Sequence, residues 1–252
     1  FIIHNKFGTK MKTASIIIIG NEILSGRTKD SNSNYLAKIL VKKGIALREV
    51  RVIPDNHNII KSVVNSESSL KDYVFTSGGI GPTHDDITAE AVASSFDVPL
   101  IVRDEAVELL AMNYKNGKKD LNAARLRMAR IPEGAKLIKN KISGAPGFII
   151  KNVFVMAGVP QIFEAMVQEI SVDLDQIEPI LSKTIKIFKK ESEISERLWQ
   201  YADRYKDISI GSYPFNNSGV FGVEIVLSHT DITLLNKIFN EILLDFNEPN
   251  TN

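Results

Sequence analysis

The feature that most constrains the fold is the stretch ASIIII at 14–19, with four consecutive isoleucines, which ends at Gly20. A run without polar alternation is typical of a strand that is buried on both faces, as in a parallel sheet. Strands that alternate with helices predict an α/β fold, in which right-handed crossovers place helices on both faces of a mostly parallel sheet. After the first strand, the patterns predict a helix that contains Leu36, Ile39 and Leu40, a strand at 47–53, a helix at 59–70, a strand at 73–77 and a helix at 88–96.

The remaining patterns divide the chain into two domains. The acidic, aperiodic stretch SVDLDQIEPILSK marks a boundary, so we expect a three-layer domain over 14–172 and a small α+β domain over 180–248. Residues 1–13 precede the first regular pattern and are expected to be a disordered or non-native extension. The other expected elements are helices at 105–114, 121–129 and 161–170, strands at 147–150 and 153–156, and in the small domain a strand at 184–188, a helix at 194–205, strands at 208–213 and 220–227, and a helix at 234–246.

The ends of the first helix carry ordinary helix signals. Ser31 or Ser33 is the expected N-cap, because a short hydroxyl side chain can accept a hydrogen bond from the first helical turn. Gly44 is the expected C-terminal stop, since glycine tolerates the left-handed conformation that often ends a helix.

The composition excludes several classes of function. The 252-residue chain has 31 basic and 30 acidic side chains, and its net charge of +1 gives no overall field that would attract nucleic acid or an anionic membrane. Its apolar runs are far shorter than the roughly 20 residues of a membrane span, so no membrane partner is expected. The absence of cysteine excludes disulfides, thiolate zinc sites and cysteine nucleophiles, and it fits a cytoplasmic protein.

Ligand-type residues follow four of the expected strands. In an open parallel sheet, ligands bind at the carboxyl ends of the strands. Three of the four loops at these ends carry a carboxylate, so the sequence predicts a ligand site at one edge of the sheet. The loops are Gly20-Asn21-Glu22, Pro54-Asp55, the segment from Gly78 to Asp86, and Gly158-Val159-Pro160.

The longest loop, TSGGIGPTHDD at 76–86, combines a phosphate-type glycine pattern with two acids. Gly78, Gly79 and Gly81 would let backbone N–H groups approach an anion at the positive end of the next helix. Asp85 and Asp86 would repel a bare phosphate, but a divalent cation binds carboxylate and phosphate oxygens together. The alternative is that the two acids only cap the helix that begins at residue 88. The residues alone leave both interpretations open.

The other candidate residues also have structural alternatives. Glu22 is either a cation ligand or general base, or a solvated loop acid. Asp55 follows a proline and is most simply a turn residue. Arg125, Arg127 and Arg130 could meet a second phosphate, but a solvated helix face is the commoner explanation for such a group.

Several segments together resemble a known family. They are IIIIGNEILSGRTKDSNSNYLAKIL, VIPDN, TSGGIGPTHDDITAEAVA and GVPQIFEAM. These segments are similar to the molybdopterin-binding-type domain of the MoaB/Mog superfamily, and within it to the branch of the CinA N-terminal region and the N-terminal domain of eukaryotic FAD synthase. SGAPGF at 143–148 resembles a further CinA-type segment, and IGSYP at 210–214 resembles the small domain that follows.

The resemblance implies a MoaB/Mog-like α/β fold and assigns roles to individual residues. Asp55 and Asp86 fall on the two functional aspartates of MogA-type relatives, and Glu22, Asp30 and Asn32 fall on the GxE and DxN positions. Asp85 and Asp86 are the expected ligands of a divalent cation, which would be Mg²⁺, Mn²⁺ or Co²⁺. The residues expected to contact a pterin phosphate or nucleotide phosphate are Gly20, Asp30, Asn32, Gly78, Gly79, Gly81, Pro82, Thr83, Gly158 and Pro160.

Two functions follow from the resemblance. The CinA and FAD synthase branch implies metal-dependent hydrolysis of a nucleotide pyrophosphate, ADP-ribose or FAD, with Asp86, Asp85, Glu22 and Asp55 as the catalytic residues. The MogA-type relatives imply adenylylation or handling of molybdopterin, and the alternative function is therefore a protein that binds molybdopterin, or a related phosphorylated ligand, without hydrolytic turnover. Neither the deamidase domain of full CinA nor the adenylyltransferase domain of FAD synthase follows this region, so neither of those activities is expected. Relatives also imply a homo-oligomer.

Overall fold

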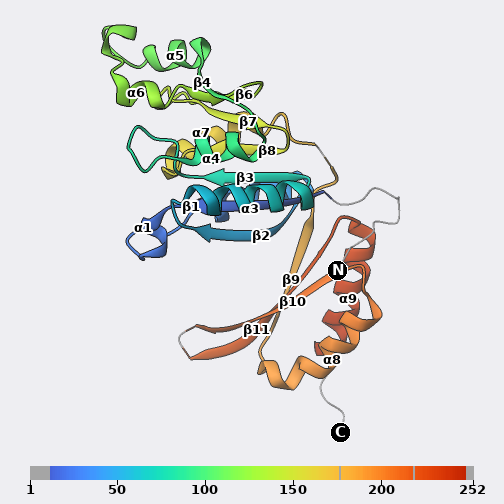
Figure 1. Cartoon of the computed structure of the whole chain (residues 1–252). Helices are drawn as coiled ribbons and strands as arrows, with labels where there is room; N and C mark the ends of the chain where they lie inside the picture. The colour runs from blue at the N-terminus through green and yellow to red at the C-terminus, as the bar shows by residue number, and fades with distance from the viewer. Residues whose placement is uncertain (1–11, 176, 218, 248–252) are drawn as a thin grey trace. The chain divides into compact units, whose positions relative to one another are not determined.

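The computed structural model describes residues 12–175, 177–217 and 219–247, which form two compact units (Figure 1). The larger unit contains residues 12–41 and 45–175, and the smaller unit is formed chiefly by the residues from 177 onward. Residues 1–11 of the extension expected at 1–13 lie outside the described residues, whereas Thr13 already belongs to the first strand. No helix in the described ranges has the length and apolar content needed to cross a membrane.

The larger unit follows the expected alternation of strands and helices. Its elements are β1 (Thr13–Ile19), α1 (Asn21–Leu24), α2 (Asn32–Lys42), β2 (Ala46–Ile53), α3 (His57–Leu70), β3 (Tyr73–Ser77), α4 (Thr88–Ser95), β4 (Leu100–Val102), α5 (Asp104–Ala111), the 3-10 helix η1 (Gly117–Asp120), α6 (Ala123–Arg127), β5 (Arg130–Pro132), β6 (Lys136–Ile138), β7 (Gly147–Ile150), β8 (Val153–Met156) and α7 (Pro160–Ile170).

Strands of the larger unit form a six-stranded sheet in the order β2-β1-β3-β8-β7-β6. β1 pairs in parallel with β2 and β3, and β3 pairs in parallel with β8. β7 runs antiparallel to both of its neighbours, and the turn at Lys151 and Asn152 sends the chain from β7 directly back along β8. The mostly parallel sheet expected from the sequence is confirmed, and the carboxyl ends of β1, β2, β3 and β8 lie along one edge.

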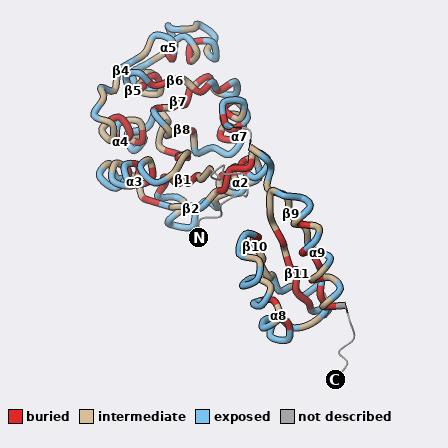
Figure 2. Tube along the Cα trace, turned by 90° about the vertical axis from the view of Figure 1, so that its right-hand side faces the viewer, coloured by how far each residue is buried: buried red, intermediate tan, exposed pale blue. Residues whose placement is uncertain are grey.

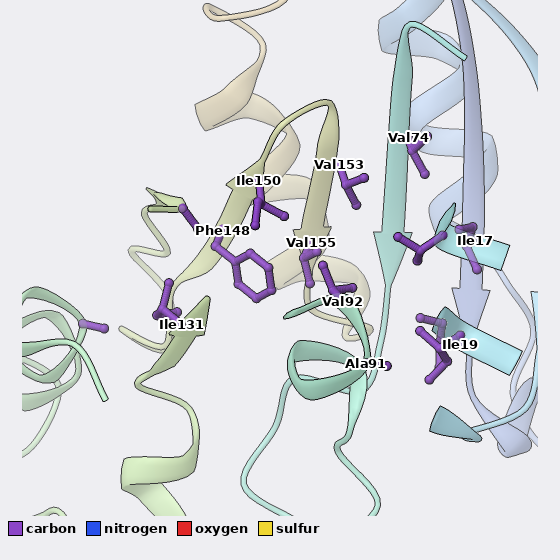
Figure 3. Packing of buried hydrophobic residues seen from close by; sticks show 14 of the residues in the cluster. Ile17, Ile19, Val74, Ala91, Val92, Ile131, Phe148, Ile150, Val153 and Val155 are labelled. Carbon is purple, nitrogen blue, oxygen red and sulfur yellow. The ribbon is translucent and has the colours of Figure 1, made fainter. Parts of the chain in front are cut away.

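Successive residues of the central strands enter two separate cores, one on each face of the sheet. In β1, Ile16 and Ile18 pack with α2 and α7, while Ile17 and Ile19 pack with α3 and α4. The buried residues follow the strands and the inward sides of the helices (Figure 2). Figure 3 shows the second core, where Ile17 and Ile19 lie with Val155 of β8. Because β1 is buried on both faces, its sequence can contain four consecutive isoleucines with no alternation between polar and apolar residues.

Some local predictions differ from the structure. The loop after β1, expected to be irregular, contains the short helix α1. The helix expected at 105–114 ends at Ala111, and the helix expected at 121–129 is reduced to the five residues of α6. Beyond α6 the chain leaves the helix and forms β5, which pairs antiparallel with β4. This pairing joins segments distant in sequence, so local periodicity could not reveal it.

The smaller unit confirms the expected α+β order. Its sheet has the order β10-β11-β9, with both pairings antiparallel. Ile194 and Leu198 of the first helix and Leu235 and Ile238 of the second pack with the sheet residue Ile225 in one core. The elements are β9 (Leu181–Ile187), α8 (Glu191–Arg204), β10 (Ser209–Asn217), β11 (Val220–His229) and α9 (Ile232–Asn247).

Two valine substitutions in the larger sheet test the importance of two-sided burial. Val155 in β8 is 0% exposed, whereas Val50 in β2 is 48% exposed. Val155→Ala should lower the free energy of unfolding by about 2 kcal/mol, because it removes buried methyl groups and leaves a cavity. Val50→Ala should cost less than about 0.5 kcal/mol. Urea unfolding followed by circular dichroism measures both, and equal losses would contradict the packing described.

Candidate functional site

A cavity of about 360 Å³ lies at the carboxyl edge of the larger sheet. All four loops expected at this edge contribute to its wall: those after β1, β2, β3 and β8. The acids and glycines selected from separate stretches of sequence therefore lie together. The predicted site residues in the wall are Gly20, Glu22, Asp55, Gly78, Gly79, Gly81, Pro82, Asp85, Asp86 and Gly158.

Two glycines of the loop after β3 adopt conformations that other residues rarely allow. Gly78 has a φ of 111° and Gly79 a φ of 69°. A Cβ on Gly78 would lie 2.1 Å from the carbonyl oxygen of Ile19, and a Cβ on Gly79 would lie 2.1 Å from Oγ1 of Thr88. The backbone N–H of Thr88 also donates to the Gly79 carbonyl at 2.9 Å. Glycine is therefore required at both positions, and it keeps the loop against β1 and the start of α4.

Thr83 holds the two acids of this loop. Its backbone N–H donates to Asp86 Oδ2 at 2.7 Å, and its hydroxyl oxygen lies 2.6 Å from both Asp86 Oδ2 and Asp85 Oδ1. A hydroxyl has a single proton, so it can donate to only one carboxylate at a time. The Thr83 hydrogen bond lowers the pKa of Asp85, with a smaller contribution from the nearby His84. Thr83, expected to contact the ligand, thus positions two acids that line the cavity.

These contacts test whether the two acids cap the helix that follows them. α4 begins at Thr88 with Ile87 in the N-cap position, and among the described residues no side chain caps it. The Asp86 carboxylate instead accepts hydrogen bonds from Thr83. Neither acid therefore caps α4 through a hydrogen bond, as one interpretation expected, and a cation bound by the two acids stays a prediction.

Asp55 shares the cavity wall with the other acids. Its Oδ2 accepts a hydrogen bond from the backbone N–H of Asn21 at 2.9 Å, which ties the loop after β2 to the loop after β1. Burial raises the pKa of Asp55, and the negative charges of Glu22 and Asp85 raise it further, against the opposing effect of the Asn21 N–H. An aspartate with a raised pKa accepts a proton more readily than an ordinary one, so Asp55 suits the role of a general base.

The oxygen donors of the cavity fit a hard divalent cation. Glu22, Asp55, Asp85 and Asp86 all line it, and carboxylate oxygens are the ligands that Mg²⁺ and Mn²⁺ prefer. Within the part of the chain that the structure describes, no three acidic or histidine side chains are grouped closely enough to hold a metal ion. A cation at this wall would therefore need further oxygen ligands, such as those of a phosphate.

Asp30 and Asn32 brace the loops around the cavity. Asp30 Oδ1 accepts from the backbone N–H groups of Asn32 at 2.9 Å and Ser33 at 3.3 Å, so Asp30, and not Ser31 or Ser33 as expected, bonds the first turn of α2. The amide of the buried Asn32 donates to Ser77 Oγ and to the Gly158 carbonyl, each at 2.8 Å. Both residues line a smaller cavity of about 40 Å³, together with Glu22, Gly158 and Pro160.

Part of the cavity wall was missed by the sequence reasoning. Met128, Asn140, Ser143 and Ala145 also line the cavity, and the last three lie between β6 and β7. The segment SGAPGF, which begins at Ser143, is the sequence signal that could have identified this connection.

Of the three arginines considered for a second phosphate, Arg127 bonds the loop after β3, which carries Asp85 and Asp86. Its Nη2 donates to the backbone carbonyl of Asp86 at 3.3 Å. Arg125 instead lies over the Tyr114 ring, 4.3 Å from its centroid, and donates to the Asp120 carbonyl. The structure therefore gives these two arginines different surroundings.

Comparison with known proteins finds a match for each part of the chain. Residues 15–179, about two thirds of the chain, match the family described as probable molybdopterin binding domain. Residues 179–249 match the middle domain of FAD synthase.

Individual relatives are similar over most of this chain. A protein of Archaeoglobus fulgidus is 37% identical over 199 residues, which cover 79% of this chain and 84% of that protein. The probable FAD synthase of Caenorhabditis briggsae is 32% identical over 243 residues, which cover 86% of this chain and 46% of that protein. The crystal structure of the protein CinA with unknown function from Thermoplasma acidophilum is 34% identical, with a TM-score of 0.60, over 64% of this chain and 97% of that chain. The chain thus spans about half the length of its FAD synthase relative.

Two glycine substitutions separate steric crowding from backbone strain. Gly79 and Gly134 have similar φ values, 69° and 78°, but a Cβ on Gly134 would meet nothing within 4 Å. Gly134→Ala should cost about 1–2 kcal/mol of unfolding free energy through strain alone. Gly79→Ala should cost about 1–3 kcal/mol more, because its Cβ would overlap Thr88. Chemical denaturation of both variants tests this, and equal costs would show that the loop is not tightly packed.

Asp55→Asn tests the like-charge environment of the cavity. Folding raises the pKa of the Asp55 carboxyl above its ordinary value of 3.8. At pH values between the unfolded and the folded pKa, the folded protein still holds the carboxyl proton that the unfolded chain has lost. The stability of the fold therefore decreases as the pH rises from the unfolded to the folded pKa. The amide of the variant carries no charge, and its oxygen can still accept from Asn21. The variant should therefore melt at a higher temperature than the parent at pH 7, and the difference should vanish at about pH 3.

Asp120→Asn provides a control of opposite sign. Hydrogen bonds from Asn116 lower the pKa of Asp120, so its ionised form stabilises the fold and its replacement should lower the melting temperature at pH 7. Differential scanning calorimetry at the two pH values compares the variants. A lower melting temperature for Asp55→Asn at pH 7 would contradict the expected charge repulsion.

Proposed function

The chain belongs to the family of probable molybdopterin binding domains, and we propose that it is a divalent-metal-dependent pyrophosphatase acting on a nucleotide such as ADP-ribose or FAD. One observation carries the proposal: Glu22, Asp55 and the Asp85–Asp86 pair, from three loops, line one cavity with a phosphate-type glycine loop. The cavity lies at the carboxyl edge of the sheet of a MoaB/Mog-like fold, where α/β proteins bind ligands. The name of the FAD synthase relative supports a nucleotide as the ligand.

The loop after β3 provides the phosphate end of the site. Backbone N–H groups at Gly78, Gly79 and Gly81 can approach phosphate oxygens, because no side chain intervenes. Asp85 and Asp86 would hold a divalent cation, which when bound neutralises phosphate charge and orients a water molecule. Thr83 keeps the two carboxylates in place through its backbone and hydroxyl hydrogen bonds.

Asp55 and Glu22 are the candidates for activating the water. One of these carboxylates takes a proton from the water while the water oxygen bonds to one phosphorus atom, and the bond from that phosphorus to the bridging oxygen breaks. The bridging oxygen leaves with the other phosphate. ADP-ribose and water then give AMP and ribose 5-phosphate, and FAD and water give AMP and FMN. Asp55 is the better candidate, because its burial and neighbouring charges raise its pKa.

A different observation favours a second function, the binding of a pterin phosphate without turnover. The family model that matches residues 15–179 is described as a probable molybdopterin binding domain. The glycine loop and the cavity would then bind molybdopterin, or a related phosphorylated ligand, and release it unchanged. A ligand that stabilises the protein against heat but stays intact over hours would select this function.

Turnover assays with an acid variant test the proposed hydrolysis. The purified protein should release AMP from ADP-ribose or FAD in the presence of Mg²⁺, Mn²⁺ or Co²⁺. Asp86→Ala should lower the rate by roughly 10- to 100-fold, because the carboxylate that helps to hold the cation is lost. Chromatography of the nucleotides measures the AMP released.

Asp207→Ala is the matched control, because Asp207 is an exposed acid of the smaller unit. It should leave the rate unchanged. AMP release no faster than that of Asp86→Ala, with every cation, would rule out the pyrophosphatase.

A further inference from the structure

The cavity has two chemically different ends along the sheet edge. The acids follow β1, β2 and β3, at one side of the strand order. β6 runs in the same direction as β8, since both are antiparallel to β7, so the connection after β6 opens at the same edge. That connection supplies Asn140, Ser143 and Ala145 to the wall, and Met128 and Val159 also line the cavity. The residues that line this second end of the cavity are therefore uncharged.

Asn140 fixes the shape of this second end. Its side chain is buried, and its Oδ1 accepts from the backbone N–H groups of Ile142 at 3.0 Å and Ser143 at 3.3 Å. Its Nδ2 donates to Ser143 Oγ at 2.6 Å and to the Ala145 carbonyl at 3.0 Å. One amide thus uses both of its donors and its acceptor to hold residues 142–145, so the turn is set before a ligand arrives.

This arrangement makes the Ser143 hydroxyl a donor. Its oxygen already accepts from Asn140, and its own proton has no acceptor among the described residues. Because Ser143 lines the cavity, that proton is available to a ligand. The acids at the other end offer only acceptors when they are ionised, so the two ends would recognise different chemical groups.

We propose that the Ser143 hydroxyl donates a hydrogen bond to a ring nitrogen or carbonyl of the heterocycle of a nucleotide, with Asn140 as its positioning residue. The orientation of the nucleotide in the cavity rests on the proposed function, in which its phosphates bind with the cation at the acidic end. The heterocycle then lies at the uncharged end, where Ala145 offers an apolar contact, and Met128 and Val159 are further apolar residues of the same cavity wall. Purines have ring-nitrogen acceptors that suit such a donor.

Calorimetric titration with AMP and with ribose 5-phosphate, each in the presence of Mg²⁺, tests this assignment. AMP carries the heterocycle and ribose 5-phosphate lacks it. Ser143→Ala should weaken AMP binding about fivefold, the typical effect of one neutral hydrogen bond, and leave ribose 5-phosphate binding unchanged. Ser171→Ala, which removes a hydroxyl bonded to Gln168 at the end of α7, should change neither affinity.

Asn140→Asp tests the positioning role. The ionised carboxylate of this variant cannot donate and would accept the Ser143 proton, so AMP binding should weaken about as much as in Ser143→Ala. The variant that carries both Ser143→Ala and Asn140→Asp should bind AMP about as strongly as the single variant with the lower AMP affinity. The two losses should not add, because both changes remove the same hydrogen bond. Ser143→Ala keeps the backbone bond to Asn140, so it remains informative if Asn140→Asp does not fold.

Three results would overturn the assignment: no AMP binding by the parent protein, equal weakening of both ligands by Ser143→Ala, or no weakening of either. The result of this binding test can be distinguished from the result of the turnover assay that tests the proposed function. AMP binding that depends on Ser143, without turnover of ADP-ribose or FAD, would support the inference and reject the hydrolysis. Turnover with an unchanged KM in Ser143→Ala would do the reverse.

Discussion

Two-sided burial of the central strands is the constraint on which the rest of the larger unit depends. Ile16 and Ile18 enter one core and Ile17 and Ile19 the other, so a shift of one residue in register would exchange the two faces. Strands packed in this way have little room for polar side chains, which therefore collect where the strands end. Parallel pairing of β1, β2, β3 and β8 brings those ends to one edge, and the packing thereby determines where a ligand site can form.

The acidic side chains of the cavity and a phosphate bound at the glycine loop would both be negatively charged. Glu22, Asp55, Asp85 and Asp86 line one cavity, and neighbouring negative charges help to raise the pKa of Asp55. Such a wall repels a bare phosphate but attracts a cation. A phosphate supplies oxygens that the cation needs, and the cation offsets the repulsion between phosphate and carboxylates. We therefore expect the cation and the phosphate to bind cooperatively, each weakly alone.

Continuous local patterns predicted much of the fold, whereas contacts distant in sequence could not be predicted. β3, β7 and β8 have the bounds expected from their apolar runs, and the acid and glycine loops follow from the strand ends. β4 and β5 are three residues long and depend on pairing with each other, so neither gives a clear local pattern. The role of Asp86 was open because a carboxylate just before a helix can serve as a cap or a ligand. Asn140 and Ser143 lie in a connection without clear periodicity.

The affinity for Mn²⁺ tests the cooperative binding of cation and phosphate most directly. Electron paramagnetic resonance of free Mn²⁺ during titration with the protein gives this affinity, with and without AMP. The described arrangement predicts that AMP tightens Mn²⁺ binding by about tenfold or more, and that Asp86→Asn removes the effect. The same Mn²⁺ affinity with and without AMP would contradict it, because the cavity would then not join a cation to a phosphate.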